Sequence, residues 1–552
     1  MVDVSVVSDA VENAVPCAPA SALGLSWTGE EAPDFAGESL VAGCERVRET
    51  TYVVSDPITG SLGVAFGGTV APIADANGWP VQAVLAPMYP EWLGGRSFTE
   101  AHGVRFPYVA GAMANGIATT RLVIEMARAG CLGFFGAGGL EFDRVRAAID
   151  ELSDALGTDL PWGANLIHSP NEPALEAAVA DLYIEQGVRK VSAAAYMSLT
   201  PAIVRYSSSG LALDATGALR RPNMVLAKVS RPEVARHFMN PAPHAMLSDL
   251  VAAGLLTQQE AELGATVPVA EDITVESDSG GHTDRRPLGP LLAAVQMVRD
   301  EIMAVRGYAR PIRLGAAGGI SSPQSVASAF ALGASYVLTG SINQACVESG
   351  LSPEGKELLV QANVADVAMA PAADMFELGV DLQVLQRGSM FAPRARQLYK
   401  AYRSYASLDA IPADEAHDIE TKVLGMTIDE CWQATRSFWT DRDPAEVAKA
   451  EADPRHKMAL TFRSYLGLSS RWAIDGDPDR RLDYQIWCGP SMGAFNDWAA
   501  GSFLAAAAER TVSQVAMNLL EGATVITRAH QLRAVGVAIG DSAFNYRPRR
   551  FG

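Results

Sequence analysis

One histidine in this chain follows a pattern that could carry proton-transfer chemistry. The stretch Ile273-Thr-Val-Glu-Ser-Asp-Ser-Gly-Gly-His282 predicts a buried strand that ends in Gly280, Gly281 and His282. An imidazole titrates near neutrality, so it can donate or accept a proton during catalysis. A lone histidine is more often structural or exposed, and the position at a strand end is what favours a functional role here. We therefore take His282 as the candidate proton donor of a reacting face.

Two later strands also end in glycine. Ala317 is followed by Gly318 and Gly319, and the strand beginning at residue 336 runs into Gly340 and Ser341. Glycines allow backbone N–H groups to approach phosphate oxygens, and the N-terminus of a following helix adds a positive dipole end. Either pair alone could be a simple turn. Both pairs together favour a cofactor that carries a phosphate.

A third set of candidates lies at the ends of earlier strands. Ala112, Met113 and Ala114 end the first predicted strand, where a flat ring could lie against the backbone; tight packing is the alternative. Asn165 ends the third strand and could hydrogen-bond the edge of a heterocycle. We count all four as candidate cofactor-binding residues.

Lys228 is a charged residue inside the apolar strand Leu226-Ala-Lys-Val-Ser230. Lysine is rarely buried without a partner. It could face a ligand oxygen or an anionic ring, as a catalytic or cofactor-binding residue. A structural ion pair with a carboxylate such as Glu276 on the neighbouring strand explains it nearly as well.

Eight short apolar runs, most of them separated by helix-like segments, would position these residues. Continuous apolar stretches are typical of parallel strands buried on both faces. Eight such units predict a (β/α)8 barrel of the α/β class, because the glycine signals follow units seven and eight, where many barrels bind phosphate. An open doubly wound sheet is the alternative. The runs are 108–113, 132–137, 162–168, 190–197, 224–230, 272–279, 312–319 and 336–342.

The chain divides into three predicted regions. Residues 1–100 form a small β or irregular region, with a hairpin from strands at 51–55 and 62–66 around the turn Asp56-Pro-Ile-Thr-Gly60. Residues 101–345 form the barrel, and residues 346–552 form a mostly helical domain that covers the barrel or gates its substrate. Its predicted helices are 377–385, 395–405, 416–438 and 503–535.

Composition limits the function classes. The net charge of −19 argues against nucleic-acid binding and adsorption to anionic membranes. The N-terminal residues show no signal peptide and no run of about 20 apolar residues occurs, so a cytoplasmic location without membrane attachment is expected. The six cysteines include no CxxC pair, so we predict neither a disulfide framework nor a metal site.

The motifs at 109–117, 276–282 and 316–320 resemble the nitronate monooxygenase and FabK-type enoyl reductase superfamily of FMN barrels. More narrowly, 272–284, 369–376 and Trp487-Cys-Gly-Pro-Ser-Met-Gly-Ala-Phe-Asn-Asp497 resemble the PfaD family of trans-acting enoyl reductases, which serve polyunsaturated fatty acid and polyketide synthases. The resemblance covers roughly residues 85–545.

This resemblance implies FMN as cofactor and NADPH, or less readily NADH, as hydride donor. It implies the enoyl thioester of an acyl carrier protein as substrate, so carrier domains are the expected partners. It also places His282 beside the flavin and substrate, and it assigns Gly318, Gly319 and Gly340 to the phosphate site. Gly280 and Gly281, which precede His282, are further candidate cofactor-binding residues. Gly340-Ser-Ile-Asn stands where the wider superfamily has Gly-Thr-Arg-Phe, which leaves the phosphate ligands open.

Two other functions stay open. One is a nitronate monooxygenase-type oxidase on the same scaffold, and the other is a non-catalytic protein that docks carrier domains. The sequence does not define acyl chain length, the choice between NADPH and NADH, or the oligomeric state. A homodimer is a candidate because (β/α)8 enzymes often self-associate.

Overall fold

The computed structural model describes residues 23–73, 78–170 and 172–551, and they form two compact units. One unit combines the chain up to residue 93 with residues 518–547, and the other spans 94–517 with the last residues of the chain. No helix in the described ranges is long and apolar enough to cross a membrane.

The first unit is built on a five-stranded sheet of order β3-β2-β5-β1-β4. The predicted hairpin is confirmed: Thr51 of β2 pairs with Phe66 of β3 in antiparallel register. The Asp56 carboxylate accepts the amide of Ile58 at 2.7 Å and so closes the turn. The elements are β1 (Leu25–Thr28), α1 (Gly37–Glu45), β2 (Thr51–Ser55), β3 (Leu62–Phe66), β4 (Thr69–Pro72), β5 (Trp79–Leu85), much of α20 (Val512–Ala534) and η9 (Asp541–Phe544).

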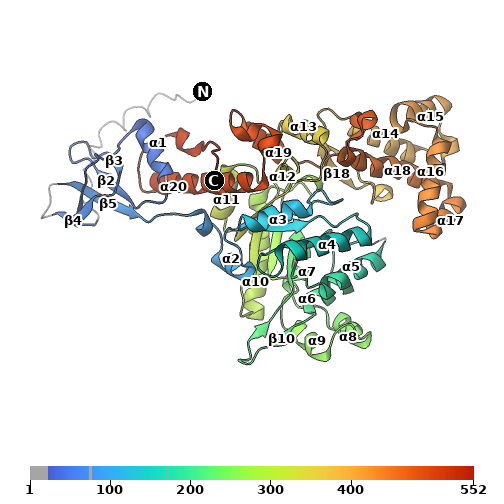
Figure 1. The fold of residues 1–552 in the computed structure, drawn as a ribbon, viewed down its shortest axis with the longest axis horizontal. Helices are drawn as coiled ribbons and strands as arrows, with labels where there is room; N and C mark the ends of the chain where they lie inside the picture. Colours follow the sequence, from blue (N-terminus) through green and yellow to red (C-terminus); the bar gives the residue numbers. More distant parts are fainter. Residues whose placement is uncertain (1–22, 74–77, 171, 552) are drawn as a thin grey trace, which may run out of the picture. The chain divides into compact units, whose positions relative to one another are not determined.

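The second unit contains a closed barrel of eight parallel strands, in the order β12-β13-β15-β16-β6-β7-β8-β9. Figure 1 shows the outer helices, among them α3 to α7 and α10, beside these strands. The predicted (β/α)8 barrel is confirmed, and each strand starts within one residue of its prediction. The strands are β6 (Tyr108–Ala110), β7 (Leu132–Phe135), β8 (Gly163–Ile167), β9 (Lys190–Ala194), β12 (Met224–Val229), β13 (Asp272–Glu276), β15 (Arg313–Ala317) and β16 (Tyr336–Thr339).

Helices follow the strands, and local capping residues mark where they begin and end. Ser322 caps α11 through a capping box, and Pro323 occupies the first helical position. The helices are α2 (Arg96–His102), α3 (Thr120–Arg128), α4 (Phe142–Leu156), α5 (Pro173–Glu185), α6 (Pro201–Ser208), α7 (Pro232–Met239), α8 (His244–Ala252), α9 (Gln258–Gly264), α10 (Leu288–Arg306), α11 (Pro323–Ala331) and α12 (Ser341–Gln344), with a small hairpin of β10 (Ala212–Leu213) and β11 (Leu219–Arg220).

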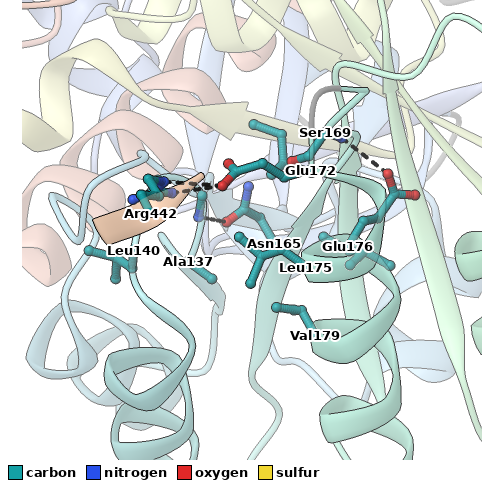
Figure 2. Close-up of a pocket in the computed structure, with 13 residues that line it drawn as sticks. Ala137, Leu140, Asn165, Ser169, Glu172, Leu175, Glu176, Val179 and Arg442 are labelled. Atoms are coloured by element: carbon teal, nitrogen blue, oxygen red, sulfur yellow. Dashed lines mark hydrogen bonds and ion pairs between the residues drawn. The ribbon is translucent and has the colours of Figure 1, made fainter. Parts of the chain in front are cut away.

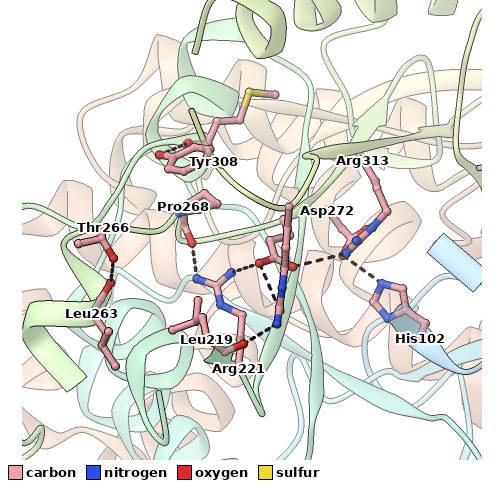
Figure 3. Close-up of polar contacts among 12 residues, drawn as sticks. His102, Leu219, Arg221, Leu263, Thr266, Pro268, Asp272, Tyr308 and Arg313 are labelled. Carbon is pink, nitrogen blue, oxygen red and sulfur yellow. Dashed lines mark hydrogen bonds and ion pairs between the residues drawn. The ribbon is translucent and has the colours of Figure 1, made fainter. Parts of the chain in front are cut away.

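A buried ionic cluster lies at the N-terminal face of the barrel (Figure 3). Asp272 and Arg313 are the first residues of adjacent strands, and two hydrogen bonds of 2.6 Å join them. His102 of α2 adds a contact of 3.0 Å from Nε2 to Asp272. Burial alone would raise the pKa of Asp272, but His102 and Arg313 outweigh it and lower the pKa to about 2. This face opposes the carboxyl ends of the strands, so the cluster is structural.

The region after the barrel is mostly helical, as predicted, but three predicted helices are wrong in detail. The predicted helix 503–535 is α-helical only over Val512–Ala534, after short turns at Phe503–Ala505 and Ala507–Glu509. Residues 377–385 form one short turn, η3 (Phe376–Leu378), and then strand β18 (Asp381–Leu385), because Gly379 at φ +71° ends the turn. Four consecutive residues of β18, from Leu382 to Leu385, are buried. The predicted helix 416–438 is broken at Gly425, also at φ +71°, and restarts at the Thr427 capping box.

Strands β17 (Val367–Pro371), β18 and β14 (Gly281–His282) form a three-stranded antiparallel sheet. The remaining elements of this region are α13 (Pro353–Val360), α14 (Phe391–Ser404), η4 (Leu408–Ala410), α15 (Ala413–Ile419), η5 (Glu420–Leu424), α16 (Ile428–Arg442), α17 (Pro444–Ala452), α18 (Pro454–Asp475), η6 (Pro478–Asp483), α19 (Ser491–Ala499), η7 (Phe503–Ala505) and η8 (Ala507–Glu509).

Candidate active site

The predicted site residues come together because all eight strands run in one direction. The carboxyl ends of β6, β8, β12, β13, β15 and β16 therefore meet at one end of the barrel, which we call the barrel mouth. Each candidate from the sequence lies on one of these strands or in the loop that follows it.

Interior packing directs side chains toward the mouth. The hydroxyl of Thr274 and the Tyr336 hydroxyl are 2.7 Å apart, and both groups are buried. Lys228 of β12 is the register partner of Thr274 in β13, and Glu276 lies two residues beyond Thr274 in β13. Side chains two residues apart in a strand lie on the same face, so all three side chains share the interior face of the barrel. The Lys228 Nζ lies 2.9 Å from Glu276 Oε1, and both side chains remain partly exposed. The ion pair that the sequence offered as an alternative for Lys228 is therefore present.

His282 lies in the connection after β13, where it forms part of the short strand β14 of the three-stranded sheet. It pairs with Leu382 of β18, and its Nε2 lies 3.2 Å from Asp374 Oδ1. The imidazole remains 45% exposed, so it is accessible to a ligand. Burial opposes ionisation of Asp374, yet the contact with His282 outweighs this effect and lowers the Asp374 pKa. The pair thus presents an imidazole oriented by a carboxylate.

Gly280 shows why this loop needs glycine. A Cβ at Gly280 would lie 2.6 Å from the Cys488 backbone nitrogen, so residues 487–489 pack directly on it. Gly281 has φ +80°, a left-handed conformation that glycine adopts without strain. The side chain of Gln383 fixes the same loop, because its Nε2 donates to Asp278 Oδ1 at 3.0 Å and to Ser279 O at 2.8 Å.

The end of this loop is held by a second ion pair. Arg231 bonds both carboxylate oxygens of Asp284 at 2.9 Å, and the Ser230 hydroxyl adds a bond of 2.6 Å. Arg231 is the main reason that the pKa of Asp284 falls to about 2. These contacts anchor the loop to the end of β12, so His282 is held between two fixed points.

The glycines after β15 form an open cradle. Gly318 and Gly319 have φ +76° and +68°, and a Cβ at Gly318 would lie 2.7 Å from Ser277. Among the described residues, the amides of Gly318 and Gly319 donate no hydrogen bond. Buried Ala317 precedes them, and its carbonyl accepts the Ser277 amide at 2.8 Å. A pocket of about 370 Å³ lies here, lined by Gly318, Gly319 and the first residues of α10.

The loop after β16 differs from this cradle. A Cβ at Gly340 would meet nothing within 4 Å, which leaves space beside the N-terminus of α12. The Ser341 hydroxyl accepts the Gly489 amide at 3.2 Å and keeps its own proton to donate.

The loops after the first three strands are tied together. Met113 is buried beside Gly136, where a Cβ would lie 1.8 Å from the Met113 carbonyl oxygen. Ala112 and Ala114 are partly exposed on either side of it. The buried Asn165 accepts the Gly138 amide at 3.0 Å through Oδ1. Its Nδ2 makes no hydrogen bond within the described ranges, so it remains available to a ligand.

A small pocket of about 50 Å³ next to Asn165 is bounded by a residue of the helical region (Figure 2). Arg442, the last residue of α16, contacts Glu141 at 2.7 Å and Glu172 at 2.9 Å. Both carboxylates lie in loops at the barrel mouth, so the helical region is linked to the mouth by ion pairs.

Sequence reasoning missed four contributors to this site: Asp374, Gln383, Arg442 and residues 487–489. Asp374 and residues 487–489 lie in the motifs 369–376 and 487–497, which resemble the PfaD family. No sequence pattern indicated which barrel loop these motifs contact.

The closed barrel of eight parallel strands with its outer helices defines the class of (β/α)8 barrels. The family model described as nitronate monooxygenase matches residues 96–387, more than half of the chain, so the chain belongs to this family. A second model, the inserted helical domain of [acyl-carrier-protein] S-malonyltransferase, matches residues 405–484. These matches confirm the superfamily resemblance that the sequence motifs predicted.

Three similar proteins extend the comparison. A component of the polyunsaturated fatty acid synthase of Thraustochytrium sp. is 44% identical over 83% of this chain and 31% of its own length. Polyketide biosynthesis protein PksE of Bacillus subtilis is 41% identical over 80% of this chain and 57% of its own. The chain thus spans about a third to just over half of these curated relatives. The crystal structure of the enoyl reductase domain of MlnA, from the macrolactin biosynthesis cluster of Bacillus amyloliquefaciens, is 36% identical with a TM-score of 0.77, covering 80% of this chain and 99% of that chain.

Proposed function

We propose that this protein is a flavin-dependent enoyl reductase. It would use NADPH or NADH to reduce the 2,3 double bond of an enoyl thioester carried by an acyl carrier protein. The observation that carries the proposal is the similarity to the MlnA enoyl reductase domain over 99% of that domain, combined with an accessible His282 at the barrel mouth. The synthase relatives support a place in polyketide or polyunsaturated fatty acid biosynthesis.

The residues present fit FMN. The free amides of Gly318 and Gly319 and the open space at Gly340 suit a phosphate, and Asn165 Nδ2 suits the edge of a flat heterocycle. Ala112, Met113 and Ala114 would border the ring, and the ammonium of Lys228 would offset negative charge on it. Gly280, Gly281, Ala317 and Ser341 complete the proposed cofactor-binding set. A bound flavin supplies the two-electron chemistry that protein side chains lack.

The net reaction adds one hydride and one proton across the double bond and oxidises one nicotinamide. The hydride ends on the β-carbon and the proton on the α-carbon. His282 is the proposed source of that proton, because its exposed ring lies in the loop after β13 at the barrel mouth and is oriented by Asp374. Lys228, held by Glu276, is proposed to stabilise charge rather than to transfer a proton.

The deciding experiment follows the visible absorbance of the flavin without oxygen. NADPH should bleach the absorbance, and a crotonyl thioester on a carrier protein should restore it. Bleaching that only oxygen reverses, with turnover of nitronates, would support the oxidase function instead. A colourless protein that FMN cannot reconstitute would contradict the cofactor proposal.

A substitution at Gly340 tests the proposed phosphate site after β16 without relying on activity. Because a Cβ there meets no protein atom within 4 Å, we expect Gly340→Val to fold and to lower the FMN content at least tenfold.

The matched control is Gly467→Val in α18, where an added Cβ also meets nothing within 4 Å. This variant should keep its FMN. Flavin content and thermal unfolding measured on the same samples separate a blocked phosphate site from a misfolded protein. Full flavin occupancy in Gly340→Val would remove Gly340 from the site.

A further inference from the structure

Helix α14 carries an unusual concentration of positive charge for this acidic chain. Its residues Phe391–Ser404 include four basic residues and no acidic one, whereas the whole chain has a net charge of −19. One of the four, Arg394, is bound to the buried Asp483. The other three, Arg396, Lys400 and Arg403, are exposed and follow the i, i+4, i+7 spacing of one helix face.

A fourth cation joins this stripe from the neighbouring helix. The guanidinium of Arg455, near the start of α18, lies 4.5 Å from the centre of the Tyr402 ring. Within the part of the chain that the structure describes, no carboxylate forms an ion pair with Arg396, Lys400, Arg403 or Arg455. We call these four residues the basic face.

The basic face is fixed relative to the barrel mouth. The apolar side of α14 packs into the core of the helical region through residues such as Leu398 and Ala401. Arg396 donates a hydrogen bond to the carbonyl of Met369 on β17. This contact places one end of the basic face at the edge of the three-stranded sheet.

The pairing of the three strands gives the approximate distance from Met369 to Gly281, the neighbour of His282. Met369 pairs with Gln383, and Gln383 pairs with Gly281, the residue before His282. Adjacent strands lie about 4.8 Å apart, so two spacings, about 10 Å, separate Met369 from Gly281. The Arg396 end of the basic face therefore lies about two strand spacings from Gly281, at the edge of the sheet opposite β14, which carries His282.

We propose that the basic face is the docking surface for an acidic acyl carrier domain that delivers its enoyl thioester to His282. This inference rests on the proposed enoyl reductase function. The four cations complement the negative surface of such a domain, and a flexible prosthetic arm can bridge the short distance to the mouth. The match of residues 405–484 to a helical insertion of an enzyme named for acyl-carrier-protein chemistry adjoins α14 directly.

The test compares two substrates with the flavin-loaded full chain. One is a crotonyl thioester on an acidic carrier domain, and the other is crotonyl-N-acetylcysteamine, which lacks the carrier. Lys400→Glu combined with Arg403→Glu should lower kcat/KM for the carrier-bound substrate about tenfold or more, and should leave the small thioester unchanged. The wild-type preference for the carrier should also weaken as salt screens the charges.

A matched control carries the same change of charge on the opposite side of the barrel. Arg128 ends α3 and Arg220 lies on β11, and both are exposed. The double variant Arg128→Glu with Arg220→Glu should behave as wild type with both substrates. The pair Lys400→Arg with Arg403→Lys should keep most of the carrier preference, since it retains both charges.

The outcomes separate the docking surface from the proposed function. A wild type that reduces neither substrate would overturn the function itself. A wild type that reduces both, with an unchanged Lys400→Glu and Arg403→Glu variant, would overturn the docking surface alone. Loss of RNA binding in this variant, with carrier kinetics unaffected, would identify a nucleic-acid surface and would also overturn the proposal.

Discussion

His282→Ala is expected to keep its flavin and to lower kcat on a crotonyl thioester by about 10²–10⁴-fold, the usual contribution of a positioned acid or base. The side chain lies at the barrel mouth with its ring 45% exposed, so its removal should disturb packing little. Flavin absorbance reports cofactor retention, and steady-state kinetics report turnover. Unchanged turnover would remove His282 from the mechanism.

Two further variants sharpen this result. His244→Ala changes an exposed histidine at the start of α8, outside the proposed site, and should have no effect on kcat. Asp374→Asn keeps a hydrogen-bonding group near Nε2 but removes the charge that orients the ring, so we expect a smaller fall in kcat, about tenfold. If kcat falls further in Asp374→Asn than in His282→Ala, Asp374 has a role in turnover that does not depend on orienting His282.

The second large effect concerns stability. Asp272→Asn should destabilise the second unit by about 3–5 kcal/mol, because it leaves the buried Arg313 without the carboxylate that binds it in two places. The thermal midpoint should fall by several degrees. Asp300→Asn is the control, since its ion pair with Arg299 is largely exposed on the Asp300 side and should contribute less than about 1 kcal/mol.

The buried Asp272–Arg313 ion pair also predicts a pH dependence of stability. The pKa of Asp272 is about 2 in the folded chain, below its ordinary value. Its contribution, about 2 kcal/mol, is therefore fully present above about pH 4 and is lost as the pH falls from there toward 2. The difference in stability between wild type and Asp272→Asn should thus shrink by about 2 kcal/mol across this range. A constant difference down to pH 2 would contradict the assignment.

The barrel could be predicted from the sequence because its strands are buried on both faces. That burial requires continuous apolar runs, so all eight strand starts were placed to within one residue. Local signals also mark helix ends, as the Ser322 cap and the glycines after α3, α5 and α11 show. These are local signals, in which a residue and its neighbours along the chain determine the conformation.

The helical region illustrates where local signals fail. The segment 377–385 was predicted as helix, yet its second half is strand β18, which pairs with β14 and so holds His282. A short strand with Gln383 buried at its centre has no strong pattern of its own. Its conformation depends on a partner about 100 residues earlier in the chain, which periodicity does not reveal.

By itself, the sequence determined the barrel, the strand ends that meet at its mouth, and the residue types available there for phosphate and proton chemistry. Only the tertiary structure decided that Lys228 pairs with Glu276, that Asp374 orients His282, and that residues 487–489 pack on Gly280. The physical reason is the range of the interactions. Burial and helix capping act over a few residues, whereas these ion pairs and close backbone contacts join segments that are 48 to more than 200 residues apart.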